Sequence, residues 1–158
     1  MTKIEVLKMQ LASRARRAAV TTIVLHATAG ESATGAISWL RKIGLSYHYV
    51  IAKDGTIYKC VPYGREAFHA GVSSGPTGAN VNRYSIGISF ANRNDGIDPY
   101  TEAQIRQCDL LIADLKNAIP SLAYLTTHYA ISPGRKTDPR GFPCSKVNSV
   151  GLQMWGCK

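Results

Sequence analysis

Residues 21–27 read TTIVLHA, a run of β-branched and apolar residues that is typical of a buried strand. Residues 84–91, YSIGISFA, alternate between large apolar and small side chains, which indicates a second strand with one face in the core. Asp54-Gly55 lies between two β-rich runs within residues 47–61, and this dipeptide is a strong hairpin signal. These segments predict the strands of one sheet.

Helical signals lie between the predicted strands. Ile37, Leu40 and Ile43 recur near helical spacing. Thr101 followed by Gln104 has the pattern of a capping box at the start of a longer helix. Because strands and helices are interleaved along the chain, the sequence predicts an α/β fold: a single domain with a mixed central β-sheet flanked by helices.

The chain has 158 residues, the length of one domain, and hydrophobic residues make up 45% of it. This composition excludes a disordered chain, and no apolar run approaches the ~18 residues of a membrane span. The 19 Lys and Arg residues against 10 Asp and Glu give a formal net charge of +9. An anionic envelope polymer, nucleic acid or simple solubility would each explain this charge. The basic clusters at residues 14–17 and 135–140 accompany no nucleic-acid motif, so no nucleic-acid partner is expected.

The N-terminus and the cysteines suggest a compartment. Residues 1–20 lack the uninterrupted apolar segment of a signal peptide, so we expect no export signal. The four cysteines, Cys60, Cys108, Cys144 and Cys157, are widely spaced and include no CxxC pair. This pattern favours four free thiols in a reducing compartment, whereas a Cys144–Cys157 bridge stays open as the alternative.

Two of the four histidines stand where predicted strands end. His26 is followed by small residues, and His128 is followed by a loop that contains Asp138. Two imidazoles and one carboxylate would form a three-ligand zinc site with the fourth position free for water, which is typical of catalytic zinc. Cys144, six residues beyond Asp138, is a rival for the third ligand position.

Five further stretches occur in a recognisable order: IVLHATAG (residues 23–30), SYHYVIAKDGTIYKCVP (46–62), AFHAG (67–71), NRYSIGISFAN (82–92) and THYAISPGRKTDPRGF (127–142). Together they resemble the zinc-dependent type 2 N-acetylmuramoyl-L-alanine amidases. That family includes phage amidase endolysins, bacterial amidases and peptidoglycan recognition proteins. The similarity spans about residues 21–142, and no separate wall-binding module is expected within residues 1–158.

The resemblance implies that His26, His128 and Asp138 bind Zn²⁺. It also implies that Tyr47 and Lys136 are the catalytic side chains beside the metal-bound water and the scissile carbonyl. The chain departs from the family in two respects. Ser89 stands where some members carry a glutamate that acts as general base. The third ligand also differs from the cysteine that is usual in the phage and recognition-protein branches.

Three other residues have expected roles. His69 and Asn82 are candidates for substrate contact, with a supporting role for His69 behind the ligands and loop capping by Asn82 as the alternatives. Strand alternation places Tyr47 on one face with Tyr49 and Ile51. It therefore places His48 on the opposite face, in a structural role.

These features lead to one expected function and two alternatives. We expect hydrolysis of the amide bond between N-acetylmuramic acid and L-alanine in peptidoglycan by a monomeric phage-type endolysin. Such an enzyme would be made in the cytoplasm, act on the wall after release and be drawn to anionic envelope polymers by its charge. The alternatives are a cytosolic amidase that recycles muropeptides and a non-catalytic peptidoglycan-binding protein.

Overall fold

The computed structural model describes residues 3–147 and 151–158, and its centre is a seven-stranded sheet with the order β1-β5-β4-β9-β3-β10-β11. All neighbouring strands are parallel except β4 and β5, which are antiparallel and form the hairpin predicted around Asp54-Gly55. These strands are β1 (Ile4–Val6), β3 (Thr22–Ala27), β4 (Tyr49–Ile51), β5 (Ile57–Lys59), β9 (Ser85–Phe90), β10 (Tyr124–Thr127) and β11 (Gln153–Trp155). The predicted α/β fold with a mixed sheet is confirmed.

Smaller elements surround this sheet. Two two-stranded sheets pair β2 (Ser13–Ala15) with β6 (Arg65–Ala67) and β7 (Ser74–Gly75) with β8 (Gly78–Ala79). The helices are α1 (Ala33–Ile43), α2 (Glu102–Ala118), α3 (His128–Ile131) and the 3₁₀ turns η1 (Val81–Tyr84) and η2 (Cys144–Lys146). Among the described residues, no helix is long and apolar enough to span a membrane.

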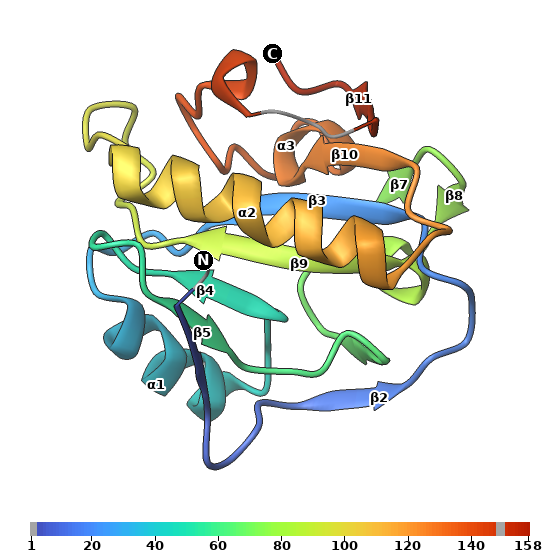
Figure 1. The fold of residues 1–158 in the computed structure, drawn as a ribbon, viewed down its shortest axis with the longest axis horizontal. Coiled ribbons are helices and arrows are strands. Elements are labelled where there is room, and N and C mark those ends of the chain that lie inside the picture. Colours follow the sequence, from blue (N-terminus) through green and yellow to red (C-terminus); the bar gives the residue numbers. More distant parts are fainter. Residues whose placement is uncertain (1–2, 148–150) are drawn as a thin grey trace.

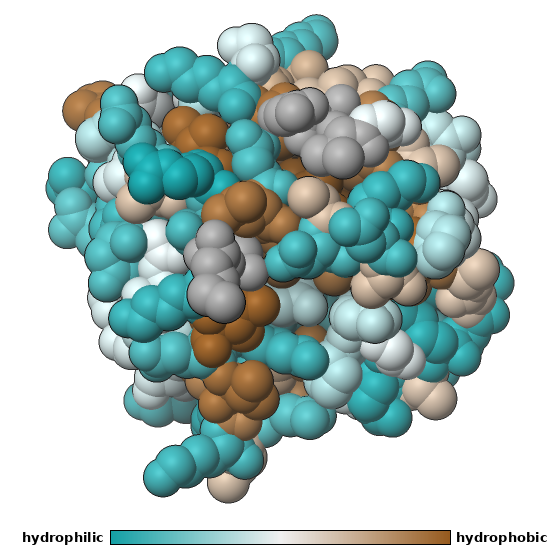
Figure 2. All heavy atoms as spheres, viewed as in Figure 1, coloured by the Kyte–Doolittle hydropathy of each residue, from teal (hydrophilic) through white to brown (hydrophobic). Residues whose placement is uncertain are grey.

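Helix α2 covers one face of the sheet. Figure 1 shows it crossing in front of β3 and β9, and its residues Leu111 and Ile112 belong to the same buried cluster as Ile23 and Ile88 of those strands. The predicted capping box starts this helix, because the Thr101 hydroxyl accepts from the Gln104 amide at 3.1 Å and the reciprocal bond is also present. The outer surface on this side is mostly hydrophilic, with a narrow apolar strip along the position of β1 (Figure 2).

The opposite face of the sheet is partly polar at its centre. The small residues of β9, Ser85, Gly87 and Ser89, point to this face, as the alternation in YSIGISFA predicts. Helix α1 packs against one side of the same face through Ile37 and Leu40. Polar side chains can therefore gather beside β3 and β9, on the side of the sheet that α2 does not cover.

The predicted placement of Tyr47 with Tyr49 and Ile51 is wrong. Tyr49 and Ile51 pack in the cluster under α2, whereas Tyr47 packs with Val50 in the cluster under α1. The physical reason is that β4 begins only at Tyr49 and His48 lies in a bend, so the strict alternation of a strand does not extend back to Tyr47. Tyr47 is thereby brought to the polar face.

The expectation of four free thiols is also wrong. Cys144 and Cys157 form a disulfide, with Cα atoms 5.9 Å apart, and Cys60 and Cys108 are free and buried. Cys144 is the first residue of η2 and Cys157 lies just after β11, so the bond ties the last residues of the described chain to the segment after Asp138. The pairing depends on β11 returning beside β10, a long-range contact that cysteine spacing does not reveal. A thiolate of Cys144 is therefore not available as a third metal ligand in this structure.

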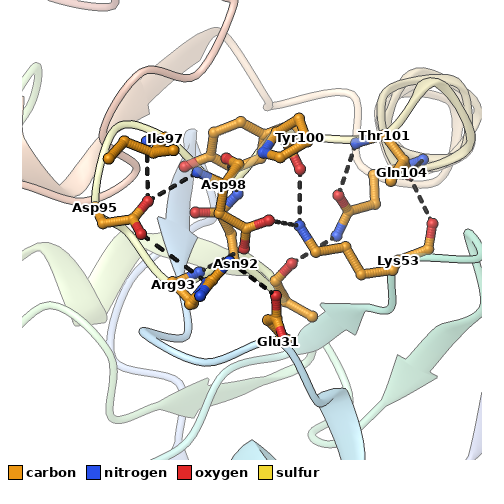
Figure 3. Close-up of polar contacts among 12 residues, drawn as sticks. Glu31, Lys53, Asn92, Arg93, Asp95, Ile97, Asp98, Tyr100, Thr101 and Gln104 are labelled. Atoms are coloured by element: carbon orange, nitrogen blue, oxygen red, sulfur yellow. Dashed lines mark hydrogen bonds and ion pairs between the residues drawn. The ribbon is translucent and has the colours of Figure 1, made fainter.

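A polar network fixes the loop between β9 and α2 (Figure 3). The buried Asp98 carboxylate accepts from Lys53 Nζ at 2.8 Å and from the Arg93 amide at 2.9 Å. Burial would raise the pKa of Asp98, but the bonds from Lys53 and Arg93 outweigh it and hold that pKa below its usual range. This loop also carries Asn94, whose side chain bonds to Thr137 and Arg140 on the segment that contains Asp138.

We expect Asp98→Ala to lower the free energy of unfolding by about 2–4 kcal/mol, because it leaves Lys53 and a backbone amide without their partner. Glu31→Ala is the matched control, since its ion pair with Arg93 is exposed on both sides at 59% and 56%. Such exposed pairs contribute at most about 1 kcal/mol. The free energy of unfolding of both variants is measured in urea. Equal losses in the two variants would contradict this explanation.

Candidate active site

His26, His128 and Asp138 meet on the polar face of the sheet. His26 lies near the C-terminal end of β3, and His128 directly follows β10. Because β3 and β10 are parallel neighbours, with Thr127 opposite Leu25, their C-terminal ends lie side by side. The chain then turns through α3 and returns, and the Tyr129 amide donates to the Asp138 carbonyl at 3.0 Å. Parallel pairing thus joins residues that are 102 positions apart in the sequence.

The ligand atoms of these three residues converge. His26 Nδ1 lies 3.0 Å from His128 Nδ1 and 3.3 Å from Asp138 Oδ2, while His128 Nδ1 lies 3.1 Å from Asp138 Oδ1. All three residues are buried, and all three ligand atoms lie within 4.8 Å of one another. Two imidazole nitrogens and a carboxylate in this arrangement suit Zn²⁺, which prefers N and O or S ligands in a tetrahedral set.

The far nitrogens of both rings are also engaged. His26 Nε2 lies 2.9 Å from His69 Nδ1, and His128 Nε2 lies 3.2 Å from the Ala70 carbonyl oxygen. An imidazole that donates through its far nitrogen presents its near nitrogen, unprotonated, to a metal. The outer contacts therefore point both Nδ1 atoms at the shared centre.

Electrostatics favour the same protonation state. Burial, together with the charge of His128, lowers the pKa of His26 to about 4, against the opposing effect of Asp138. Burial alone would raise the pKa of Asp138, but hydrogen bonds with His128 and His26 hold it far below its usual range. At neutral pH the site thus presents a neutral His26 ring and an ionised carboxylate, the forms that bind metal.

Tyr47 and Lys136 lie beside this centre. The Tyr47 ring centroid is 4.9 Å from that of His26. Burial, helped by the charge of Asp138, raises the pKa of Tyr47 to about 12, so its phenol is a hydrogen-bond donor at neutral pH rather than a base. Lys136 is exposed on the segment that carries Asp138, and its charge contributes to the lowered pKa of His26.

Ser89 occupies the position next to His26 in the sheet, since the two residues are paired in the register of β3 and β9. Its side chain is fully buried, and its Oγ has no hydrogen-bond partner of normal geometry among the described residues. The Ser89 hydroxyl lies near the Tyr47 phenol, and their interaction acts to lower the pKa of Tyr47. A buried hydroxyl without a partner is rare, and here it lies beside the converging ligands.

Two clefts open beside the centre, with volumes of about 210 and 370 Å³. Both are lined by Tyr47, His128, Arg135 and Lys136. The first has an apolar wall that includes Leu40, Leu45 and Phe68. Side chains beside the converging ligands therefore border both clefts.

His69 and Asn82 both line the first cleft, yet much of their hydrogen-bonding capacity is used inside the protein. His69 Nε2 lies 3.1 Å from Ser85 Oγ while its Nδ1 faces His26. Asn82 Oδ1 accepts from the amides of His69 and Ala70 at 3.1 and 2.9 Å. Substrate contact by these two residues stays a prediction.

His48 has the structural role that the sequence predicts. Its Nδ1 accepts from the Gly87 amide at 3.0 Å, and its Nε2 lies 2.8 Å from the Arg65 carbonyl oxygen. These two contacts fix a neutral tautomer with the proton on Nε2. Burial, opposed only in part by the bond to Arg65, lowers the pKa of His48 to about 3.

This pKa predicts a pH dependence of stability. Between pH 3 and the ordinary histidine pKa of about 6.5, the unfolded chain binds a proton at His48 that the folded chain does not. Stability from His48 is therefore full above about pH 6.5 and is lost, by up to about 1.4 kcal/mol per pH unit, as the pH falls below it. In urea unfolding from pH 7 to 5, His48→Gln should reduce the pH slope by about one proton. An unchanged slope would contradict the assignment.

Sequence reasoning missed the role of Arg16. Its guanidinium is largely buried and donates to the carbonyls of Tyr63, Ser85 and Asn82 at 2.9, 2.8 and 3.2 Å. Its neighbour Arg17 forms an ion pair with the buried Glu66 at 2.9 Å. Two of the three arginines in the basic N-terminal cluster thus hold the fold together, and the cluster contributes less free surface charge than its composition implies.

His26, His128 and Asp138 form a candidate metal site of the kind that hydrolases use, at the C-terminal ends of parallel strands. The comparisons give the family of the chain. Residues 16–141 match the N-acetylmuramoyl-L-alanine amidase family, and the chain belongs to it. The expected resemblance is therefore confirmed.

Several individual proteins and solved structures are similar to this chain. The 1,6-anhydro-N-acetylmuramyl-L-alanine amidase AmpD of Salmonella typhimurium is 39% identical over 98 residues, which are 60% of this chain and 50% of that protein. A crystal structure of AmpD superposes with a TM-score of 0.77 at 25% identity and covers 96% of this chain and 94% of that one. The endolysin amidase LysCS of Clostridium intestinale gives a TM-score of 0.76 at 25% identity, covering 97% and 98%. The chain spans about half the length of the curated relatives it matches.

Proposed function

We propose that the chain is a zinc-dependent N-acetylmuramoyl-L-alanine amidase that hydrolyses the amide bond between N-acetylmuramic acid and L-alanine. One observation carries this proposal: His26 Nδ1, His128 Nδ1 and an Asp138 oxygen converge beside two clefts, both of which His128 lines, in a chain of the amidase family. Zn²⁺ held by these three residues would lower the pKa of a bound water and polarise the scissile carbonyl.

The remaining chemistry falls to side chains around the centre. The Lys136 ammonium, which borders both clefts, stabilises the negative charge that develops on the carbonyl oxygen. The protonated Tyr47 phenol donates a hydrogen bond at the same place. Ser89 stands where some relatives use a glutamate, and a hydroxyl is not a base at neutral pH. Among the described residues that line the clefts, Asp138 is the only carboxylate, so no carboxylate outside the ligand set borders them to act as a general base.

The relatives favour a soluble substrate over an intact wall. The curated relatives with 39% identity over 98 residues carry the name 1,6-anhydro-N-acetylmuramyl-L-alanine amidase, whereas in the structural comparison AmpD and the endolysin LysCS are both 25% identical to this chain. We therefore propose the recycling alternative, in which the enzyme acts in the cytoplasm on soluble anhydromuropeptides, ahead of the endolysin role expected from the sequence.

A comparison of two substrates tests this choice. The zinc-loaded protein is incubated with a soluble 1,6-anhydromuramyl tripeptide and with purified sacculi, and the products are identified by mass spectrometry. We expect release of the free tripeptide from the soluble substrate and little solubilisation of sacculi. Faster cleavage of sacculi, with an activity that falls steeply with added salt, would favour the endolysin role instead. Cleavage of neither substrate would overturn the amidase proposal.

A further inference from the structure

The two histidines of the candidate zinc site are supported by consecutive residues. The His69 side chain faces His26 Nε2 at 2.9 Å, and the Ala70 carbonyl faces His128 Nε2 at 3.2 Å. Any shift of the backbone at this dipeptide would therefore move the outer partners of both rings at once. The orientation of the whole ligand set depends on how residues 69 and 70 are held.

One side chain holds both of these residues. Asn82 Oδ1 accepts from the His69 amide at 3.1 Å and from the Ala70 amide at 2.9 Å. The backbone of Asn82 is itself held in place, because the half-buried Arg16 donates to its carbonyl at 3.2 Å. The position of Oδ1 is thus set by the fold, independently of the metal ligands.

Other groups near the dipeptide are consistent with a rigid support. Arg135 Nη2 donates to the Ala70 carbonyl at 2.7 Å, so this oxygen receives hydrogen bonds from two sides. Gly87 leaves room for the His69 ring, since a Cβ at that position would lie 2.7 Å from His69 Cγ. The His69 ring has little space to adopt another orientation.

We propose that Asn82 is a positioning residue for the metal centre: through its bonds to the amides of His69 and Ala70 it orients His26 and His128 together. This inference rests on the proposed zinc site, and it differs from the substrate contact that the sequence suggests for Asn82. Asn82 touches neither ligand directly, and it acts through the dipeptide. Removing the outer partner of a metal-binding histidine typically weakens metal affinity by about 10–100-fold.

The test compares three variants by zinc affinity and by the visible absorption spectrum of the Co²⁺-substituted protein. We expect Asn82→Ala to weaken zinc binding by about 10–100-fold and to change the Co²⁺ spectrum, because both histidines lose their orientation. Asn82→Asp keeps an acceptor oxygen at the same place and should restore affinity to within about threefold of wild type. Ser73→Ala is the matched control in the same loop. It removes bonds to the Val81 amide and the Gly71 carbonyl but touches neither His69 nor Ala70, so it should leave both readouts unchanged.

The outcomes separate this inference from the proposed function. Wild-type affinity and an unchanged Co²⁺ spectrum in Asn82→Ala would overturn the inference, and a raised KM in that variant would then assign Asn82 to the substrate. Failure of the wild-type protein to bind zinc would instead overturn the proposed function together with this inference. Should Asn82→Ala not fold, Asn82→Ser decides the matter, since its shorter side chain cannot reach both amides.

Discussion

Replacing His128 with alanine is expected to remove metal binding and amidase activity together. His128 supplies one of three converging ligand atoms, and its loss leaves His26 and Asp138 only 3.3 Å apart with no third donor. Zinc affinity should fall by more than about 100-fold, because losing a ligand should cost more than losing the outer partner of a ligand, which costs up to about 100-fold. Hydrolysis should fall by more than about 10³-fold, beyond the loss of a single donor to the developing oxyanion.

Zinc content by elemental analysis and hydrolysis of a muramyl peptide would be measured on the same samples. His48→Gln is the matched control, because it also removes a buried imidazole but one that bonds to Gly87 and Arg65 rather than to the ligand set. That variant should be less stable and still hold one zinc ion. Stoichiometric zinc in a folded His128→Ala protein would contradict the ligand assignment.

Replacing Lys136 with alanine should have the second largest effect, and of a different kind. The ammonium borders both clefts beside His128, where the carbonyl oxygen of a bound amide would gain negative charge. Its loss should lower kcat by about 10²–10³-fold, as for other single donors to an oxyanion. Zinc content should not change, because Lys136 is not among the converging ligands.

Two comparisons make this result specific. Lys136→Arg keeps the positive charge and should recover part of kcat, whereas Lys42→Ala removes an exposed lysine of α1 that lines neither cleft and should have no effect. Loss of zinc in parallel with kcat would show that Lys136 stabilises the site instead of the transition state. An unchanged kcat would show that Lys136 takes no part in the reaction.

The parts of the fold that the sequence predicted well depend on local periodicity. The alternation of residues 84–91 placed Ile86, Ile88 and Phe90 in the core, and the capping box at Thr101 started α2 where expected. The convergence of His26, His128 and Asp138 was predicted through the family resemblance, and it arises because the two histidines stand at the ends of strands that are parallel neighbours. Tyr84 is an exception within its stretch, because it belongs to η1 and packs with Val24 on the other face.

The parts that the sequence did not predict depend on backbone groups and long-range contacts. The Ala70 carbonyl that supports His128 has no side-chain signal, and the position of Arg16 depends on carbonyls from two distant segments. Tyr47 reaches the site only because β4 begins two residues later than the β-rich run suggests. The Cys144–Cys157 bond likewise requires β11 to return beside β10.

The most direct test of a zinc amidase is a metal add-back experiment. The protein is stripped with a chelator, zinc is returned in increasing equivalents, and cleavage between N-acetylmuramic acid and L-alanine is followed by mass spectrometry. We predict no cleavage without metal, a linear rise with added zinc and saturation at one equivalent per chain. Cleavage that persists in the stripped protein, or none at one equivalent of bound zinc, would contradict the account.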